Sequence, residues 1–204
     1  EAGEFDSIML ATGENFPDAL SAGNAAAATD GIVLLTKDDV LTPETLQFLE
    51  DSANEDVYAI GGPAQRAAAA VDLPVVGVFG DDRYETAVDV AERFFEPGAG
   101  LWGVALASGE NVPDALASGV GAGRNGNPVV LTKPDEFPEV TDGYVRAVAA
   151  PAGRLVLGFV IGGEAAVSAE VEEAFEAALT GVVVDPEPPV DPELAPAIAV
   201  ERLD

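Results

Sequence analysis

The sequence holds only two lysines, Lys37 and Lys133, and each closes the same short motif, LLTK at 34–37 and VLTK at 130–133. An ammonium group suits an anionic ligand, and the neighbouring Thr36 and Thr132 are candidate ligand contacts with the lysines. The alternative, which we favour, is that each lysine pairs with a carboxylate that follows it directly. These carboxylates are Asp38 and Asp39 for the first lysine, and Asp135 and Glu136 for the second.

Glycine-rich turns are a second kind of candidate contact, because backbone N–H groups beside a helix N-terminus can hold an anion. Such turns occur as TGEN and SGEN and as two IGG triplets. Their glycines are Gly13, Gly61, Gly62, Gly109, Gly162 and Gly163. A tight turn is the commoner reason for glycines of this kind.

The motifs ENFPDAL and ENVPDAL place Asn15 and Asn111 three residues before Asp18 and Asp114. Amide and carboxylate groups in this pattern can bind a ligand. They also suit a helix start, where Asn caps the first turn and Asp complements the helix dipole. Capping alone accounts for the pattern, and we favour it.

The segment DRYETA at 82–87 offers Arg83 and Tyr84 as further candidates for ligand contact. We favour a structural role between repeats for both. In that role Arg83 forms an ion pair with Asp18 or Asp114.

Enzymatic chemistry finds little support among these residues. Without His or Cys, the chain lacks the commonest general base, a thiolate nucleophile and the usual transition-metal ligands. Neither a GxGxxG nor a GxxxxGK[ST] phosphate-binding motif occurs. Paired carboxylates can hydrolyse glycosides, but with 37 acidic residues the proximity of two in sequence is uninformative. We predict a non-catalytic segment without a cofactor.

The charge balance excludes several partners. Nine basic residues stand against 37 acidic ones, a net charge of −28, so nucleic acid and anionic membrane surfaces are excluded. No apolar run is long enough to cross a bilayer. An acidic, lysine-poor chain rich in Ala, Val and Gly favours a salty setting, where ions screen the self-repulsion. The alternative is an acidic extracellular protein from a GC-rich organism.

An internal repeat organises all of these candidates. LATGENFPDALSAG at 10–23 and LASGENVPDALASG at 106–119 agree at ten of fourteen positions, at an offset of 96. LLTK and VLTK keep this offset, whereas AIGG at 59–62 and VIGG at 160–163 lie 101 apart. The second copy therefore carries five extra residues, which we place around 151–154.

Short apolar runs alternate with amphipathic stretches along both copies, which is typical of an α/β fold. Strands are predicted at 7–11, 32–36, 57–60, 74–79, 103–107, 128–132, 155–161 and 200–204. Helices are predicted at 16–29, 43–51, 64–71, 83–95, 112–123, 136–149 and 168–179. We expect two tandem, pseudo-symmetric, Rossmann-like units, each a parallel sheet covered by helices.

The predicted organisation has four parts. A first repeat spans 1–79 and lacks its N-terminal helix, and a second repeat spans 80–184. A Pro-rich, acidic linker follows at 185–196, and 197–204 resembles the strand VVGVFG that precedes DRYETA, as if a further repeat began there. We therefore interpret the chain as a window from a longer array.

The ordered set DRYETA, ENFPDALSAG, ENVPDALASG, LLT, VLT and the two IGG turns resembles the cell wall binding repeat type 2 family. The resemblance covers nearly the whole chain apart from the Pro-rich tail. It implies parallel α/β units, usually three with pseudo-threefold symmetry, in secreted prokaryotic surface proteins. It also implies noncovalent attachment to an anionic polymer of the cell envelope. This chain departs from the pattern in having about two repeats and a far more acidic composition.

Three hypotheses follow. The first is an extracellular anchoring module that binds an envelope polymer or glycan, with high salt or bridging divalent cations offsetting the charge repulsion. The second is a structural module that assembles with other copies of the same repeat into an S-layer, a filament or a virus-like surface structure. The third is an accessory domain of an envelope amidase or protease.

Overall fold

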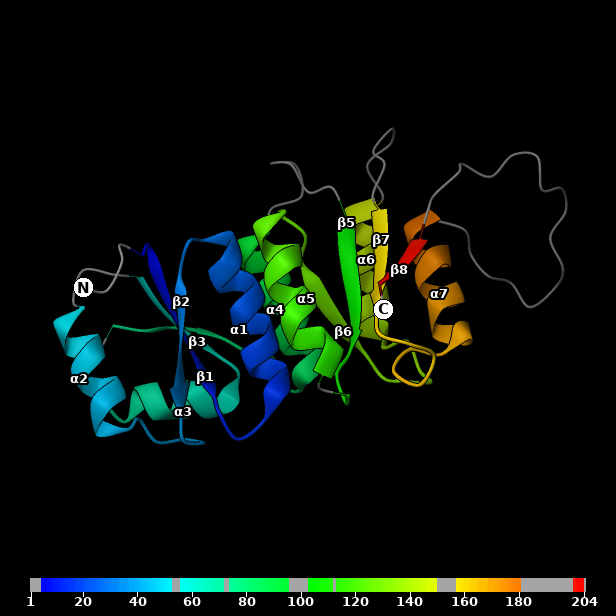
Figure 1. Cartoon of the computed structure of the whole chain (residues 1–204). Coiled ribbons are helices and arrows are strands. Elements are labelled where there is room, and N and C mark those ends of the chain that lie inside the picture. Colours follow the sequence, from blue (N-terminus) through cyan, green and yellow to red (C-terminus); the bar gives the residue numbers. More distant parts are fainter. Residues whose placement is uncertain are drawn as a thin grey trace, which may run out of the picture.

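The computed structural model describes residues 5–52, 56–71, 74–95, 103–111, 113–149, 157–180 and 200–203, with the backbone alone for 113–118 and 200–203. Strands and helices alternate throughout, which confirms the predicted α/β class (Figure 1). The predicted insertion at 151–154, the linker at 185–196 and the side chain of Asp114 lie outside the described residues.

The described part of the first half contains four strands and four helices. In order these are β1 (Ser7–Thr12), α1 (Phe16–Ala28), β2 (Ile32–Thr36), α2 (Pro43–Asp51), β3 (Asp56–Ile60), α3 (Gly62–Ala69), β4 (Val76–Val78) and α4 (Arg83–Phe94). The strands form one parallel sheet in the order β2-β1-β3-β4.

The second half repeats this series. Its described elements are β5 (Gly103–Ser108), α5 (Pro113–Arg124), β6 (Val129–Thr132), α6 (Glu139–Ala149), β7 (Leu157–Ile161), α7 (Ala169–Thr180) and β8 (Val200–Leu203). The sheet order β6-β5-β7-β8 reproduces that of the first sheet, again with parallel pairing. The registers match too, since Leu10 pairs with Leu34 as Leu106 pairs with Val130.

Each sheet buries apolar side chains on both faces, as expected of parallel strands. In the first sheet, Ile8 and Leu10 belong to a core with α2 and α3, whereas Met9 and Ala11 belong to a core with α1 and α4. Alternation along one strand thus places successive residues in different cores.

Helix α4 follows from its sequence and belongs to both halves. It begins at Asp82, whose carboxylate accepts hydrogen bonds from the backbone N–H groups of Tyr84 (2.8 Å) and Glu85 (2.9 Å). Its buried Val90 belongs to the core of the first sheet, whereas Ala87 and Val88 belong to cores of the second. The helix therefore joins the two repeats.

Helices α1 and α5 lie side by side at the centre of the molecule (Figure 1). Glycine at 119 and 123 permits the close approach, because a Cβ on Gly119 would overlap with Leu20 and one on Gly123 with the carbonyl oxygen of Asn24. Small residues at the contact thus set the distance between the repeats.

Buried Asn24 adds polar specificity to this junction. Its side-chain amide donates to the carbonyl oxygens of Gly119 (3.0 Å) and Asn127 (3.2 Å) and accepts from the backbone N–H of Val129 (3.0 Å). A residue of the first repeat therefore satisfies the first amide of β6, a strand at the edge of the second sheet.

Candidate ligand-binding edge

The carboxyl ends of the strands in both sheets face the same side of the molecule. Figure 1 shows β1 and β5 descending to the lower edge, from which α1 and α5 rise. The turns there are alike, because Gly13 donates its N–H to Thr36 (2.9 Å) as Gly109 does to Thr132 (2.8 Å). In parallel α/β folds this is the edge at which ligands bind.

The two lysines at this edge have different surroundings. The Nζ of Lys133 lies 2.7 Å from Oε2 of Glu136, and this hydrogen bond raises the pKa of Lys133. No carboxylate of the described residues is paired with Lys37, which lines an open hollow of about 590 Å³ together with Glu14, Asp38 and Val40. The second repeat thus has the local ion pair that its sequence favours, whereas in the first repeat the lysine has no ion pair with a described carboxylate.

The threonines beside these lysines point into the turns. Thr36 is buried and donates its hydroxyl to the carbonyl oxygen of Asp38 (2.7 Å). Thr132 is buried too, and its hydroxyl lies 3.0 Å from the carbonyl oxygens of Lys133 and Glu136. Both hydroxyls therefore hold the strand-end turns in shape.

Asn15 stands at the N-cap of α1, as predicted, but the predicted capping bond is absent. An N-cap side chain accepts from the second or third backbone N–H of its helix. Pro17 removes the first of these donors. The Asn15 side chain is therefore exposed at this edge and does not cap α1. The side chain of Asn111, in contrast, donates to the carbonyl oxygen of Ala165 (3.2 Å).

Gly61 and Gly162 require glycine, because their φ angles are 85° and 97°. Gly61 also lies against the carboxylate of Asp18, and its N–H donates to the carbonyl oxygen of Val78 (3.0 Å). This amide is therefore used within the sheet. Gly62 begins α3, and the exposed Gly163 follows β7 in the second repeat.

Asp18 is a partly buried carboxyl group at this edge. Burial raises its pKa above the ordinary value of 3.8, and the positive charge of Arg83 partly offsets this. Arg83 donates to the carbonyl oxygen of Gly109, and the ion pairs among described side chains, Lys133–Glu136 and Arg146–Asp142, do not include it. The interaction between Arg83 and Asp18 is therefore electrostatic rather than a direct ion pair.

Tyr84 also reaches the second repeat. Its hydroxyl donates to the carboxylate of Glu110 (3.4 Å). Burial, followed by the negative charge of Glu110, raises the pKa of Tyr84 to about 12. Arg83 and Tyr84 thus fasten the start of α4 to the loop after β5.

Sequence reasoning missed Asn24, whose side chain makes three hydrogen bonds between the repeats. The sequence does contain one signal for this role of Asn24, because the equivalent position of the second copy is Val120. Where two copies agree closely, an amide exchanged for an apolar side chain marks a position with different surroundings.

Fold and edge together define a tandem α/β repeat module. Within the described ranges, no cluster of three metal-ligating side chains occurs. None of the described helices has the length and apolar character needed to cross a membrane. The chain belongs to the cell wall binding domain 2 (CWB2) family, whose model matches residues 2–69 and 78–172.

The relatives are proteins of bacteria. The chain is 28% identical over 144 residues to the N-acetylmuramoyl-L-alanine amidase LytC of Bacillus subtilis, covering 68% of this chain and 28% of the amidase. Cwp8 of Clostridium difficile shares the fold with a TM-score of 0.67 at 21% identity, over 98% of this chain and 31% of Cwp8. Cwp6 of the same organism has a TM-score of 0.68 at 23% identity, over 85% of this chain and 28% of Cwp6.

These comparisons establish a non-catalytic cell wall binding family and a location at the cell surface. They also confirm the family resemblance and the repeated parallel-sheet fold. The chain spans less than a third of the length of each of these relatives.

Proposed function

We propose that the chain is a noncovalent anchor that binds a cell envelope polymer along the carboxyl edge of its two sheets. The observation that carries this proposal is the placement of both sets of strand-end turns on one side of the molecule (Figure 1). A repeated ligand, such as a glycan chain, can contact two equivalent turns at once. Each weak contact then raises the effective concentration of the ligand at the next.

The chemistry of the edge favours a hydroxyl-rich ligand that carries some negative charge. Exposed Asn15 offers both donors and an acceptor for sugar hydroxyls. Lys37, without a carboxylate partner among the described side chains, offers a charged donor in the hollow that it shares with Glu14 and Asp38. We infer that the first repeat makes the stronger ligand contact, because its lysine is not held by any described carboxylate.

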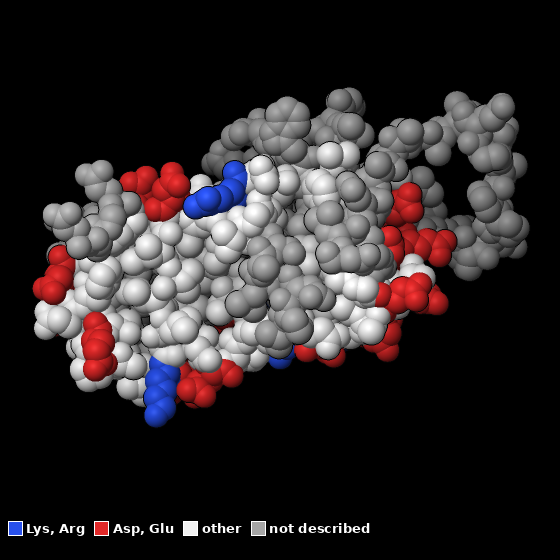
Figure 2. Space-filling model, viewed as in Figure 1, with Lys and Arg blue, Asp and Glu red and all other residues white. Residues whose placement is uncertain are grey.

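The net charge of −28 opposes an anionic polymer. Figure 2 shows acidic side chains gathered in several places on one face, where basic side chains stand singly. Dissolved salt screens this repulsion, and bridging divalent cations would neutralise it locally. We therefore expect binding to strengthen with ionic strength or with divalent cations, the reverse of binding by a basic protein.

Cosedimentation of the whole chain with purified envelope polymer tests this proposal. We expect Lys37→Gln to weaken binding several-fold and the matched variant Lys133→Gln to change it little, because Lys133 is already paired. Chelation of divalent cations, compared with added monovalent salt, separates bridging from screening. An absence of binding under every ionic condition would contradict the anchor, and equal effects of the two variants would contradict the site.

A second candidate function is that of an accessory domain in an envelope enzyme, which the similarity to part of the amidase LytC favours. In this reading the chain holds a catalytic domain of the same polypeptide near its substrate. The chain alone should release no soluble fragments from cell walls in a turbidity assay. Wall hydrolysis by the isolated chain would overturn the assignment.

A further inference from the structure

Helix α5 ends in a turn that backbone hydrogen bonds close. The N–H of Asn127 donates to the carbonyl oxygen of Ala122 (3.0 Å), and the N–H of Gly126 donates to that of Gly123 (2.9 Å). Gly126 has a φ of 71°, the left-handed conformation that such an ending needs. These bonds form a Schellman motif, which satisfies carbonyl groups in the last turn of the helix.

A side chain adds a further bond to this turn. The amide of Asn125 donates to the carbonyl oxygen of Gly121 (2.9 Å), and in the first repeat the hydroxyl of Thr29 donates to that of the equivalent Ala25 (3.0 Å). The two repeats thus make the same contact, at the offset of 96, with different chemical groups. Asn125 is exposed to solvent, and its amide has a reactivity that the hydroxyl of Thr29 does not have.

Asn125 differs from the other asparagines of the sequence in the residue that follows it. Gly126 has no side chain to hinder its backbone nitrogen, whereas the other asparagines precede Phe, Ala, Glu, Val or Pro. Asparagine is a labile residue, because the next backbone nitrogen can attack its side-chain carbonyl carbon and close a succinimide ring. The sequence at 125–126 is therefore the least hindered one for this attack.

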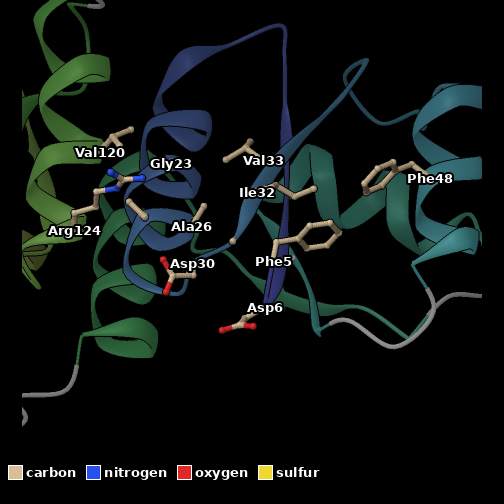
Figure 3. Close-up of a pocket in the computed structure, with 12 residues that line it drawn as sticks. Phe5, Asp6, Gly23, Ala26, Asp30, Ile32, Val33, Phe48, Val120 and Arg124 are labelled. Atoms are coloured by element: carbon tan, nitrogen blue, oxygen red, sulfur yellow. The ribbon is translucent and has the colours of Figure 1, made fainter. Parts of the chain in front are cut away.

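The last turn of α5 is open to water on the side of the first repeat. A hollow of about 830 Å³ lies there, and Arg124 of α5 lines it together with Asp30 and Gly31 at the end of α1 (Figure 3). Asn125 directly follows Arg124. Hydroxide, which starts the ring closure, and water, which opens the ring, therefore reach this turn.

We propose that Asn125 is a site of spontaneous deamidation, which the turn at the end of α5 slows. The nitrogen of Gly126 loses its proton to hydroxide and forms a bond with the side-chain carbonyl carbon of Asn125. The bond from that carbon to Nδ2 breaks, and the amide group takes a proton from water and leaves as ammonia. A second water opens the ring at either carbonyl group, which leaves aspartate or isoaspartate at position 125. The net reaction consumes water, releases ammonia and oxidises or reduces no atom.

The hydrogen bonds of the turn engage both reacting groups. The nucleophile is the nitrogen of Gly126, and its N–H is bound to Gly123. The amide that leaves is bound to Gly121. The N–H must be released and the side chain must turn before the ring closes, so the reaction proceeds from a locally opened turn. Deamidation of the native chain is therefore slower than that of the unfolded chain by the equilibrium constant for this opening.

The products weaken the junction between the repeats. Aspartate at position 125 loses the bond to Gly121 and places a negative charge at the negative end of the helix dipole. Isoaspartate also lengthens the main chain just before Asn127, whose carbonyl oxygen accepts from the side chain of buried Asn24 (3.2 Å). Modification at the end of α5 thus disturbs a hydrogen bond between the two repeats.

Incubation of the 204-residue chain at mildly alkaline pH, with and without urea, tests the site. Peptide mapping by mass spectrometry follows the conversion of each asparagine. In urea we expect Asn125 to react at least roughly tenfold faster than Asn15 or Asn111, because larger side chains follow those two. The dipeptide Asp30–Gly31 can form the same ring but releases water, so the loss of an amide identifies asparagine. Conversion of Asn125 at the rate of the others would overturn the site.

Hydrogen exchange tests the role of the turn, because the same opening exposes the N–H of Gly126 to solvent. We expect the ratio of the unfolded to the native deamidation rate to equal the protection factor of this N–H, measured by NMR, within about threefold. Equal rates in the native and the unfolded chain would contradict the slowing by the turn.

Asn125→Thr is the matched variant, because Thr29 makes the same contact in the first repeat. Before incubation it should unfold at the same urea concentration as the parent. After incubation the parent should unfold at a lower concentration, in proportion to the fraction converted at position 125, whereas the variant should be unchanged. A parent that keeps its urea midpoint after conversion would overturn the effect on the junction.

Discussion

Strands β2 and β6 have nearly the same sequence and opposite surroundings. IVLLT and VVLT occupy equivalent edges of equivalent sheets, yet all of β6 is buried whereas most of β2 is partly or fully exposed. The difference lies in α4, which belongs to both halves but packs along β6 and not along β2. The burial of a strand in this molecule thus depends on what the neighbouring repeat packs against it.

The largest effect in this comparison should come from truncating the same side chain on both strands. We expect Leu131→Ala to lower the free energy of unfolding by about 3 kcal/mol, since it leaves a cavity in the core. Leu35→Ala should lower it by less than about 1 kcal/mol, because half of that side chain is already exposed. Urea denaturation checks both. Equal losses would show that β2 is as well covered as β6.

A smaller effect is expected at the paired positions 24 and 120. Asn24→Val should cost about 2 kcal/mol, because the N–H of Val129 and two carbonyl groups lose their buried partner. The reverse change, Val120→Asn, should stay within about 0.5 kcal/mol, since Val120 is 44% exposed. Thermal unfolding followed by circular dichroism measures the two. A harmless Asn24→Val would mean that the junction contributes little to stability.

Two glycines of α5 provide a further test of the contact between α1 and α5. Gly123→Ala should destabilise the chain by roughly 1 kcal/mol or more, because its Cβ meets the backbone of α1. Gly121→Ala faces open space and should stabilise the helix by about 0.5 to 1 kcal/mol. Urea denaturation of both variants tests whether the changes in the free energy of unfolding have opposite signs. Stabilisation by both would show that α1 and α5 separate easily.

The smallest effect concerns pH. Burial raises the pKa of Asp18 in the folded chain above 3.8, so the folded state binds more protons than the unfolded state just above that value. The contribution of Asp18 to stability therefore falls as the pH rises through its folded pKa. Asp18→Asn should remove this fall, and urea denaturation between pH 3 and 7 compares it with the parent. Curves that run parallel at every pH would exclude the linkage.

The elements were predictable from the sequence because the hydrophobic periodicity and the residues that begin and end helices indicate the same boundaries. Strand β2 and helix α2 begin and end at the predicted residues, where Thr42 accepts from the N–H of Thr45 (3.2 Å) and Pro43 opens the helix. The predicted strand at 74–79 shrinks to Val76–Val78, since only these residues pair with β3. The local sequence signals were therefore strong enough to fix the bounds of β2 and α2, and the position but not the length of β4.

The surroundings of the site residues were not predictable in the same way. Lys37 and Lys133 follow the same motif and precede acidic residues alike, yet the described carboxylates pair with only one of them. Asn15 and Asn111 diverge too, because the partner of Asn111 is a carbonyl group 54 residues away. Such differences arise from distant segments, which a local motif does not encode.

The open edge of β2 also bears on solubility. No described strand pairs with the outer edge of β2, and such an edge, here with exposed Leu35, is a template for pairing with the same strand of another molecule. A net charge of −28 keeps such molecules apart in solution. The acidity that opposes an anionic ligand thereby serves as protection against aggregation, and we expect that protection to fade as the carboxylates become protonated.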